Sequence, residues 1–254
     1  MIIRKSPAEI ELMAAAGEIV AATLALLGES IRPGATTGEL DAVAEEFILS
    51  RGGEPTFKGY RGYPAATCLS PNEMVVHGIP GDYMLEEGDI LSADVGVTLE
   101  GFVADSAYTF AVGEIPDDTD RLLETCKAAL DAAVEQCREG NRLSDVSHAV
   151  QEAAESAGFS VVRELSGHGI GRSMHEDPQI LNFGEPGRGP VLGEGMTLAI
   201  EPMITMGGPE IVVHDDRWSI STEDGSLAAH FEHTVAITAA GPRILTESRV
   251  PLLR

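Results

Sequence analysis

Two aspartates lie inside segments that otherwise have the composition of buried β-strands. Asp94 falls within the apolar segment 90–97, and Asp105 falls within 102–112. Aspartate is depleted in strands because its side chain packs poorly and competes for backbone hydrogen bonds. The tight turn at 99–101 predicts a hairpin that places the two carboxylates opposite each other or one step out of register, on one face. Such a pair is tolerable when one carboxyl is protonated or a cation lies between them.

The second half of the chain repeats this pattern. Glu201 lies in the apolar segment 196–203, and Glu232 lies in the segment 228–238. A single acid of this kind is more often a solvent-facing residue of a half-exposed strand, whereas four of them indicate a site. His168 joins them from a glycine-rich turn that follows a predicted strand. Four carboxylates and one imidazole suit two divalent first-row metals better than one structural zinc.

Helices are predicted around these strands. Ser6 and Thr36 each precede a glutamate by three residues, which is the capping-box pattern of a helix start. Two further helices are expected at about 119–138 and 143–157, and other strands at 159–165, 211–213 and 217–221. Helices followed by strands thus occur twice, in halves of about residues 6–112 and 117–238 without a linker between them. We therefore expect one domain over residues 1–254, of class α+β, with internal pseudo-symmetry.

The charge balance excludes several classes of partner. The chain has 17 basic and 41 acidic residues, a formal net charge of −24. No basic surface for nucleic acid is expected, and anionic lipid would repel such a chain.

No uninterrupted run of 18 apolar residues and no apolar signal region are present, which argues against a membrane span and a secretory signal. Three cysteines without C-x-x-C spacing fit a reducing compartment, so a cytoplasmic protein is expected.

Four motifs occur in a specific order along the chain. They are Asn72-Glu73-Met74-Val75-Val76-His77-Gly78-Ile79-Pro80, Gly167-His168-Gly169-Ile170-Gly171-Arg172, Glu201-Pro202-Met203 and Phe231-Glu232-His233-Thr234. With the Asp94/Asp105 pair between the first two motifs, the chain resembles the type I methionine aminopeptidases in their short bacterial form. The resemblance covers essentially the whole chain. It implies the pita-bread (creatinase/aminopeptidase) fold of peptidase family M24, with a pseudo-two-fold axis and a central antiparallel sheet flanked by two helix pairs.

The resemblance implies a dinuclear metal site held by Asp94, Asp105, His168, Glu201 and Glu232. Asp105 and Glu232 would bridge the two metals, and Asp94 would bind one of them with both oxygens. His168 and Glu201 would complete the shell of the other metal. The metals would activate a water for peptide hydrolysis, and Glu201 would also act as the general base. Cobalt, manganese, iron and zinc all suit such a site.

Two histidines match catalytic residues of that family that do not bind metal. His175 would donate to the carbonyl oxygen and stabilise the tetrahedral intermediate, and His77 would contact the amide nitrogen of the departing peptide. We expect His214 and His230 to be surface or satisfied core residues. The positions that match the methionine pocket are Phe57, Tyr60, Tyr63, Cys68, Met174 and Trp218.

The resemblance implies an enzyme that removes the initiator methionine from nascent proteins when the second residue is small. It would act as a monomer, with N-terminal methionine peptides as substrates and the ribosome as a transient partner. The segment 207–230 contains one base, Arg217, beside five acids, which argues against docking on ribosomal RNA through this segment.

Two other interpretations remain open from sequence. The first is an X-Pro-specific peptidase of the same fold, although such enzymes usually carry an additional N-terminal domain, for which a helix that starts at Ser6 leaves no room. The second is a non-enzymatic binding protein on this fold. Such proteins typically lose metal ligands, whereas all five are present here.

Overall fold

The computed structural model describes residues 1–248, so positions 249–254 of the predicted domain lie outside the described part. The helices of this part are α1 (Pro7–Ser30), α2 (Thr37–Ser50), the 3₁₀ turn η1 (Tyr60–Gly62), α3 (Asp117–Gln136) and α4 (Leu143–Ser156). The strands of the first half are β1 (Glu54–Pro55), β2 (Cys68–Pro71), β3 (Met74–Val76), β4 (Ile90–Leu99) and β5 (Phe102–Ala111). Those of the second half are β6 (Ser160–Val161), β7 (Ser166–Gly169), β8 (Glu176–Leu181), β9 (Thr197–Ile200), β10 (Met203–Thr205), β11 (Ile211–Val213), β12 (Ile220–Thr222), β13 (Ala228–His230), β14 (His233–Thr238) and β15 (Gly241–Ile244).

Helices α1 and α2 begin where the sequence predicts. The side chains of Ser6 and Thr36 each accept a hydrogen bond from the backbone N–H of the glutamate three residues later, and that glutamate bonds back to the cap. Each box satisfies backbone donors that the first helical turn leaves without an intrahelical partner. Within residues 1–248, α1 alone is long and apolar enough to cross a membrane by length and composition. Half of its most apolar stretch is buried, and the helix packs against β4 and β5 as a core helix does.

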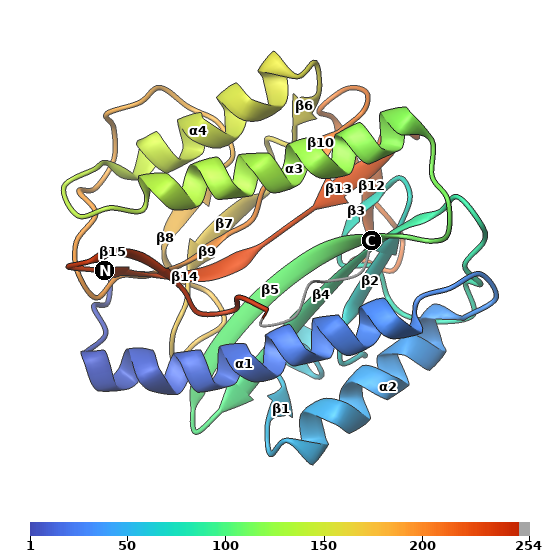
Figure 1. The fold of residues 1–254 in the computed structure, drawn as a ribbon, viewed down its shortest axis with the longest axis horizontal. Coiled ribbons are helices and arrows are strands. Elements are labelled where there is room, and N and C mark those ends of the chain that lie inside the picture. Colours follow the sequence, from blue (N-terminus) through green and yellow to red (C-terminus); the bar gives the residue numbers. More distant parts are fainter. Residues whose placement is uncertain (249–254) are drawn as a thin grey trace.

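Two antiparallel sheets form the centre of the molecule (Figure 1). In the first half, β4 pairs with β5 along its whole length and with β1 and β2 on its other edge. In the second half the strand order is β15-β14-β9-β7-β8. Two three-stranded sheets complete the structure, β13-β10-β6 and β11-β12-β3. The α+β class and the antiparallel strands agree with the expectation from sequence.

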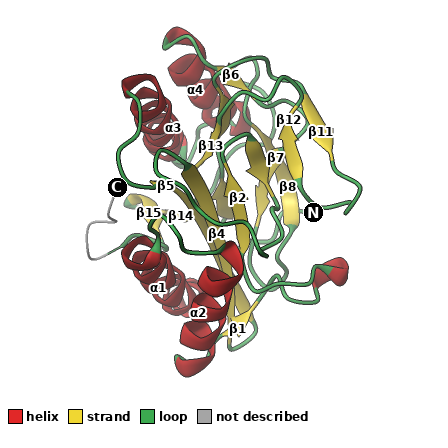
Figure 2. Cartoon of the chain, turned by 90° about the vertical axis from the view of Figure 1, so that its right-hand side faces the viewer, coloured by secondary structure: helices red, strands yellow, loops and turns green. Residues whose placement is uncertain are grey.

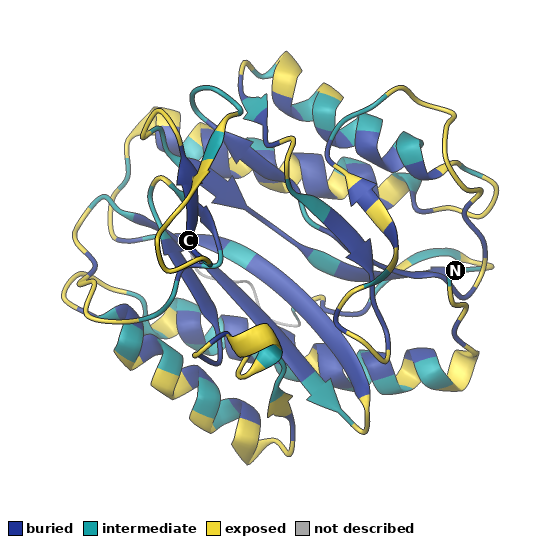
Figure 3. Ribbon diagram, turned by 180° about the vertical axis from the view of Figure 1, so that it is seen from behind, coloured by how far each residue is buried: buried dark blue, intermediate teal, exposed yellow. Residues whose placement is uncertain are grey.

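Both helix pairs lie on the same side of the strands (Figure 2). Helices α1 and α2 cover the first half, and α3 and α4 cover the second, each pair over its own apolar core. The central strands are buried on the other side as well, because loops and the smaller sheets cover them there (Figure 3). This loop-covered side contains the candidate functional residues.

The two halves meet where β5 lies beside the segment that joins β13 to β14. The backbone N–H of Glu232 donates to the carbonyl of Ala107 at 2.9 Å, and the hydroxyl of Ser106 donates to the carbonyl of Glu232 at 2.5 Å. Side-chain hydroxyls therefore replace part of a regular strand ladder at this seam. The seam brings Asp105 and Glu232, which are far apart in sequence, next to each other.

Two predicted strands are interrupted at their acidic residues. The segment predicted at 196–203 forms β9 and β10 with a break at Glu201 and Pro202, and the segment predicted at 228–238 breaks at Phe231 and Glu232. Proline cannot donate to a ladder, which accounts for the first break. The strand predicted at 159–165 is reduced to the two residues of β6. Glu201 and Glu232 therefore lie at the breaks between strands and not within a regular strand.

Candidate active site

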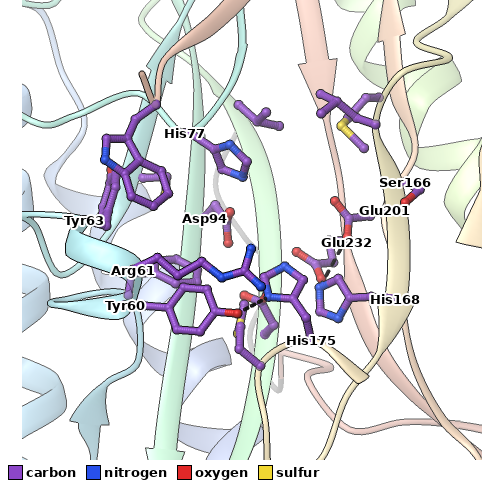
Figure 4. A pocket seen from close by; sticks show the side chains of 18 of the residues that line it. Tyr60, Arg61, Tyr63, His77, Asp94, Ser166, His168, His175, Glu201 and Glu232 are labelled. Atoms are coloured by element: carbon purple, nitrogen blue, oxygen red, sulfur yellow. Dashed lines mark hydrogen bonds and ion pairs between the residues drawn. The ribbon is translucent and has the colours of Figure 1, made fainter. Parts of the chain in front are cut away.

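A cavity of about 270 Å³ opens on the loop-covered side, between the two halves (Figure 4). Every residue assigned to the site from sequence lines it: Phe57, Tyr60, Tyr63, Cys68, His77, Asp94, Asp105, His168, Met174, His175, Glu201, Trp218 and Glu232. Six further residues line the cavity that were not assigned to the site from sequence: Arg61, Val76, Glu164, Leu165, Ser166 and Met203. Val76 and Met203 belong to two of the four ordered motifs, so the sequence contained a signal for these two residues. No sequence pattern indicated that the other four would line the cavity.

Asp94 and Asp105 enter the cavity from the hairpin β4–β5. Leu99 pairs with Phe102 across the turn, so Asp94 pairs with Ala107 while Asp105 pairs with Gly96. The two aspartates are therefore diagonal neighbours, two residues out of register, and the expectation that they lie opposite or one step apart is wrong. A shift of one residue would have turned the side chains to opposite faces, whereas a shift of two keeps them on the same face.

The other acidic residues and the imidazole come from the second half. His168 lies on β7, Glu201 follows β9, and Glu232 lies between β13 and β14. Ligand atoms of Asp105, His168 and Glu232 all lie within 4.8 Å of one another, and all three residues are buried. Nε2 of His168 lies 3.5 Å from Oε1 of Glu201, and Asp94 faces the same space from the opposite wall (Figure 4).

Buried carboxyl oxygens remain without hydrogen-bond partners in this cluster. Among the residues the structure describes, these are Oδ1 of Asp94, Oδ1 of Asp105 and Oε1 of Glu232. Burial raises the pKa of Asp94 to about 7 and raises the pKa values of Asp105, Glu201 and Glu232 well above their usual range, with repulsion between the acids as a further cause for the last three. Buried polar groups are normally paired, and repelling carboxylates need protons or cations. Oxygen-rich ligands with one imidazole fit divalent first-row metals, so these residues fit the metal centre that the sequence predicts.

Glycine allows the strands to approach closely on either side of His168. A Cβ atom added at Gly167 would lie 2.4 Å from the carbonyl oxygen of Ala199, and one at Gly169 would lie 2.1 Å from that of Asp177. No other residue type fits such a distance without moving the backbone. The glycine-rich motif around His168 therefore lets β7 lie close against β9 and the start of β8.

His77 and His175 stand at two sides of the cavity. His77 follows β3 with a positive φ of 59°, a backbone conformation uncommon outside glycine. Its ring is nearly perpendicular to that of Trp218, with the ring centroids 6.5 Å apart. Nδ1 of His175 lies 2.8 Å from the Tyr60 hydroxyl, and its ring lies 4.3 Å from that of His168. Burial lowers the pKa of His77 to about 4. Desolvation and the charge of Arg61 lower the pKa of His175, so both imidazoles are neutral near pH 7.

An ion pair shapes the loop that carries His175. Nζ of Lys5 lies 2.5 Å from Oε2 of Glu176, and both side chains are almost completely buried. The other carboxylate oxygen of Glu176 accepts hydrogen bonds from the backbone N–H groups of Arg172 at 2.9 Å and Ser173 at 3.2 Å. The N-terminal segment therefore helps to fix the turn immediately before His175. No pattern in the sequence indicated this pair.

The other end of the cavity is apolar. Phe57, Tyr63, Cys68 and Met174 are buried there, and Cys68 pairs with Asp94 across β2 and β4. The Tyr63 hydroxyl donates to the carbonyls of Thr67 and Gly78, so its polar end is satisfied. This apolar space directly adjoins the carboxylates, so the cavity has one apolar and one acidic end.

One histidine lies where the sequence did not predict it. His214 is on the surface with Nε2 2.8 Å from the Ser221 hydroxyl, as expected. His230, however, is buried, its Nε2 atom has no hydrogen-bond partner within residues 1–248, and it lies 3.7 Å from Oε2 of Glu201. The expectation of a surface or satisfied core residue is therefore wrong for His230. His230 is the last residue of β13, directly before the break at Phe231 and Glu232, and its side chain reaches the acidic cluster.

Comparison with known proteins identifies the family. Residues 11–239 match the sequence profile described as metallopeptidase family M24. A methionine aminopeptidase from Clostridium perfringens is 52% identical over 246 residues, which span 97% of this chain and 99% of the relative. The crystal structure of methionine aminopeptidase from Thermotoga maritima matches with a TM-score of 0.96 at 47% identity, covering 98% of this chain and 100% of that chain.

Proline peptidases share only the fold with this chain. A prolidase from Pyrococcus furiosus matches with a TM-score of 0.79 at 24% identity, covering 98% of this chain and 66% of that chain. The nearly full-length relatives at about half identity are methionine aminopeptidases, which favours that interpretation over the X-Pro peptidase and the non-enzymatic binding protein. The chain therefore belongs to metallopeptidase family M24 and, within it, to the methionine aminopeptidases, whose pita-bread fold it has.

Proposed function

We propose that this chain hydrolyses the peptide bond after an N-terminal methionine when the next residue is small. The observation that carries the proposal is one cavity with an acidic and an apolar end. At the acidic end, buried carboxyl oxygens have no hydrogen-bond partner among residues 1–248. The first end suits a divalent metal centre, and the second suits a methionine side chain. A small second residue would be required because its side chain must fit against the wall of the same cavity.

In this proposal Asp94, Asp105, His168, Glu201 and Glu232 would hold two divalent ions. The close grouping of Asp105, His168 and Glu232 supports the assignment. When bound, such ions lower the pKa of a water and polarise a carbonyl group. Cobalt, manganese, iron and zinc remain the candidates for this centre.

The remaining steps belong to side chains. The Glu201 carboxylate would take the proton of the attacking water and return it to the departing amide nitrogen. A neutral His175 would donate to the scissile carbonyl oxygen as negative charge develops there, and the Tyr60 hydroxyl, 2.8 Å away, would orient its ring. His77 would contact the nitrogen of the departing peptide. Neutral imidazoles suit these donor roles because they add no positive charge beside the metals.

The methionine side chain would lie among Phe57, Tyr60, Tyr63, Cys68, Met174 and Trp218. We further propose that residues 1–254 act as one catalytic domain and as a monomer. Its substrates would be nascent chains in the cytoplasm, met in transient contact with the ribosome. The acidic net charge supports the absence of direct nucleic-acid binding.

Methionine release from the peptide Met-Ala-Ser tests the proposal. Protein stripped with a chelator should be inactive, and activity should return with manganese, iron, cobalt or zinc. Glu201→Ala should remain inactive under every metal, because it loses both a ligand and the base. Met-Leu-Ser and Ala-Pro-Ser are the control substrates and should be cleaved much more slowly. Metal-loaded protein that leaves Met-Ala-Ser intact, or that prefers the proline peptide, would contradict the proposal.

A further inference from the structure

His230 is held by its backbone at the end of β13. The hydroxyl of Thr109, on β5, accepts a hydrogen bond from the His230 N–H at 3.0 Å and donates to the His230 carbonyl at 2.8 Å. The hydroxyl of Ser92 lies 2.8 Å from that of Thr109 and fills its remaining acceptor position. A side chain of the first half thus fixes the direction of a residue of the second half.

The fixed backbone directs the imidazole into the acidic cluster. His230 is 2% exposed, and within residues 1–248 its Nε2 atom has no hydrogen-bond partner. Oε2 of Glu201 lies 3.7 Å from that atom, while Oε1 of the same carboxylate lies 3.5 Å from Nε2 of His168. The Glu201 carboxylate therefore lies between two imidazoles on different strands, of which His168 is visible in Figure 4.

A buried ring nitrogen with no partner is uncommon in folded proteins and needs an explanation. Hydrogen bonds from ring N–H groups to carboxylates are about 2.9 Å long, so a small rotation of either side chain closes the remaining gap. Carboxylates that bind metal are commonly hydrogen-bonded by a second residue, which fixes their orientation. His230 has the position, the burial and the free atom for such a contact with Glu201.

We propose that His230 is a positioning residue for Glu201, with Nε2–H donating to Oε2 and holding the carboxylate in its working orientation. The inference rests on the proposed function, because it assigns Glu201 the roles of ligand and base. This contact requires that the His230 imidazole is neutral and carries its proton on Nε2. It does not require His230 to gain or lose a proton. His230 itself contacts neither substrate nor the reacting atoms.

Two substitutions at position 230 test the contact through kinetics. His230→Leu removes the donor at similar volume, and His230→Gln retains an N–H group in reach of the same oxygen. We expect His230→Leu to lower kcat for Met-Ala-Ser by about 10- to 100-fold with little change in KM, and His230→Gln to recover most of the loss. His148→Leu is the matched control, because His148 lies on α4 outside the cavity and bonds to the Gly184 carbonyl.

A second pair of measurements follows the tautomer of His230 and the binding of Zn(II). In Zn(II)-loaded protein labelled with ¹⁵N at histidine, the His230 signals, assigned by their loss in His230→Gln, should have the chemical shifts of the Nε2–H tautomer. Isothermal titration with Zn(II) should give weaker binding to His230→Leu than to the wild type or to His148→Leu. Both readouts are independent of turnover, and the tautomer is measurable even when His230→Leu does not fold.

The outcomes separate the two proposals. Wild-type protein that releases no methionine with any metal contradicts the proposed function. An active wild type with the Nδ1–H tautomer at His230, or with His230→Leu as active as His148→Leu, contradicts only the positioning role. The positioning role would also be contradicted if kcat of His230→Gln were as low as that of His230→Leu. An N–H donor at position 230 would then have no effect on turnover.

Discussion

The hydroxyl of Thr234 holds both backbone polar groups of Asp105. It accepts a hydrogen bond from the Asp105 N–H at 2.9 Å and donates to the Asp105 carbonyl at 2.8 Å, across 129 residues of sequence. Thr109 holds His230 in the same way but in the opposite direction across the seam. Each half of the chain thus fixes, in the other half, the backbone of a residue in or beside the acidic cluster.

Thr234→Val should destabilise the protein more than an ordinary buried substitution of equal size. Valine has nearly the same shape but leaves a buried N–H and a buried carbonyl of Asp105 unpaired, which should lower the free energy of unfolding by about 2–4 kcal/mol. Urea unfolding checks the value. The matched control is Thr238→Val at the end of the same strand, whose hydroxyl donates to Gly241 at 2.8 Å and where a smaller loss is expected. Equal losses at the two positions would argue against a special role for the seam.

Metal-free protein should lose stability as the pH rises through neutrality. The pKa of Asp94 is raised to about 7 and those of Asp105, Glu201 and Glu232 are raised well above their usual range, so the folded state retains protons that the unfolded state releases. Stabilisation from such groups is lost as the pH rises through their folded-state pKa values. The pKa values of the buried His77 and His168 are lowered to about 4. These histidines therefore reduce the stability of the folded state only when the pH falls below the usual pKa of a histidine.

We therefore expect the Tm of chelator-treated protein to fall between about pH 6.5 and 8.5. Added manganese should raise Tm more at the upper pH, because metal and protons compete for the same carboxylates. Differential scanning calorimetry at matched ionic strength measures both effects. A Tm that rises or stays constant across this window without metal would show that the acidic cluster does not control the pH dependence.

Lys5→Met should be strongly destabilising. The substitution leaves the buried Glu176 carboxylate without its cation and should lower the free energy of unfolding by about 3–5 kcal/mol. Activity should also fall, since Glu176 shapes the turn before His175. Lys58→Met is the control: Lys58 pairs with Glu45 at 2.6 Å on the surface, where the expected cost is below about 1 kcal/mol. Similar effects of the two substitutions in thermal and urea unfolding would contradict this account.

Gly96→Ala should disturb the methionine pocket. A Cβ atom there would lie 2.8 Å from the Phe57 ring, which would have to move within the cavity lining. We expect a loss of about 1–3 kcal/mol in the free energy of unfolding and a higher KM for methionine peptides. Gly81→Ala is the matched control because a Cβ atom at Gly81 meets no atom within 4 Å. An unchanged KM for Gly96→Ala would mean that Phe57 does not define the pocket.

His175→Ala should lower kcat for Met-Ala-Ser by about 100- to 1,000-fold with a small effect on KM, as loss of an oxyanion donor does. Tyr60→Phe removes only the hydroxyl that lies 2.8 Å from Nδ1 of His175 and should cause a smaller loss. Steady-state kinetics of both variants, with His148→Ala as a control outside the cavity, measures the difference. A His175→Ala variant with normal kcat would remove His175 from the proposed chemistry.

The local features of this protein follow from residues that are neighbours in the sequence. The capping boxes at Ser6 and Thr36 start α1 and α2 because their hydrogen bonds join residues three apart. The apolar runs around Asp94 and Asp105 predict the β4–β5 hairpin because strand periodicity and a two-residue turn are local properties. The unusual acids in those runs, together with the four motifs, indicated the family and thirteen of the residues that line the cavity.

The way in which distant segments meet depends on the packing of the two halves. The seam contacts between Thr234 and Asp105, the buried pair of Lys5 and Glu176, and the position of His230 beside Glu201 each join residues far apart in the chain or at a strand break. Side-chain periodicity records which face of an element is buried, but not which partner covers it. For that reason the sequence indicated which residues belong to the site, while only the packed halves fixed their register, their neighbours and the direction of His230.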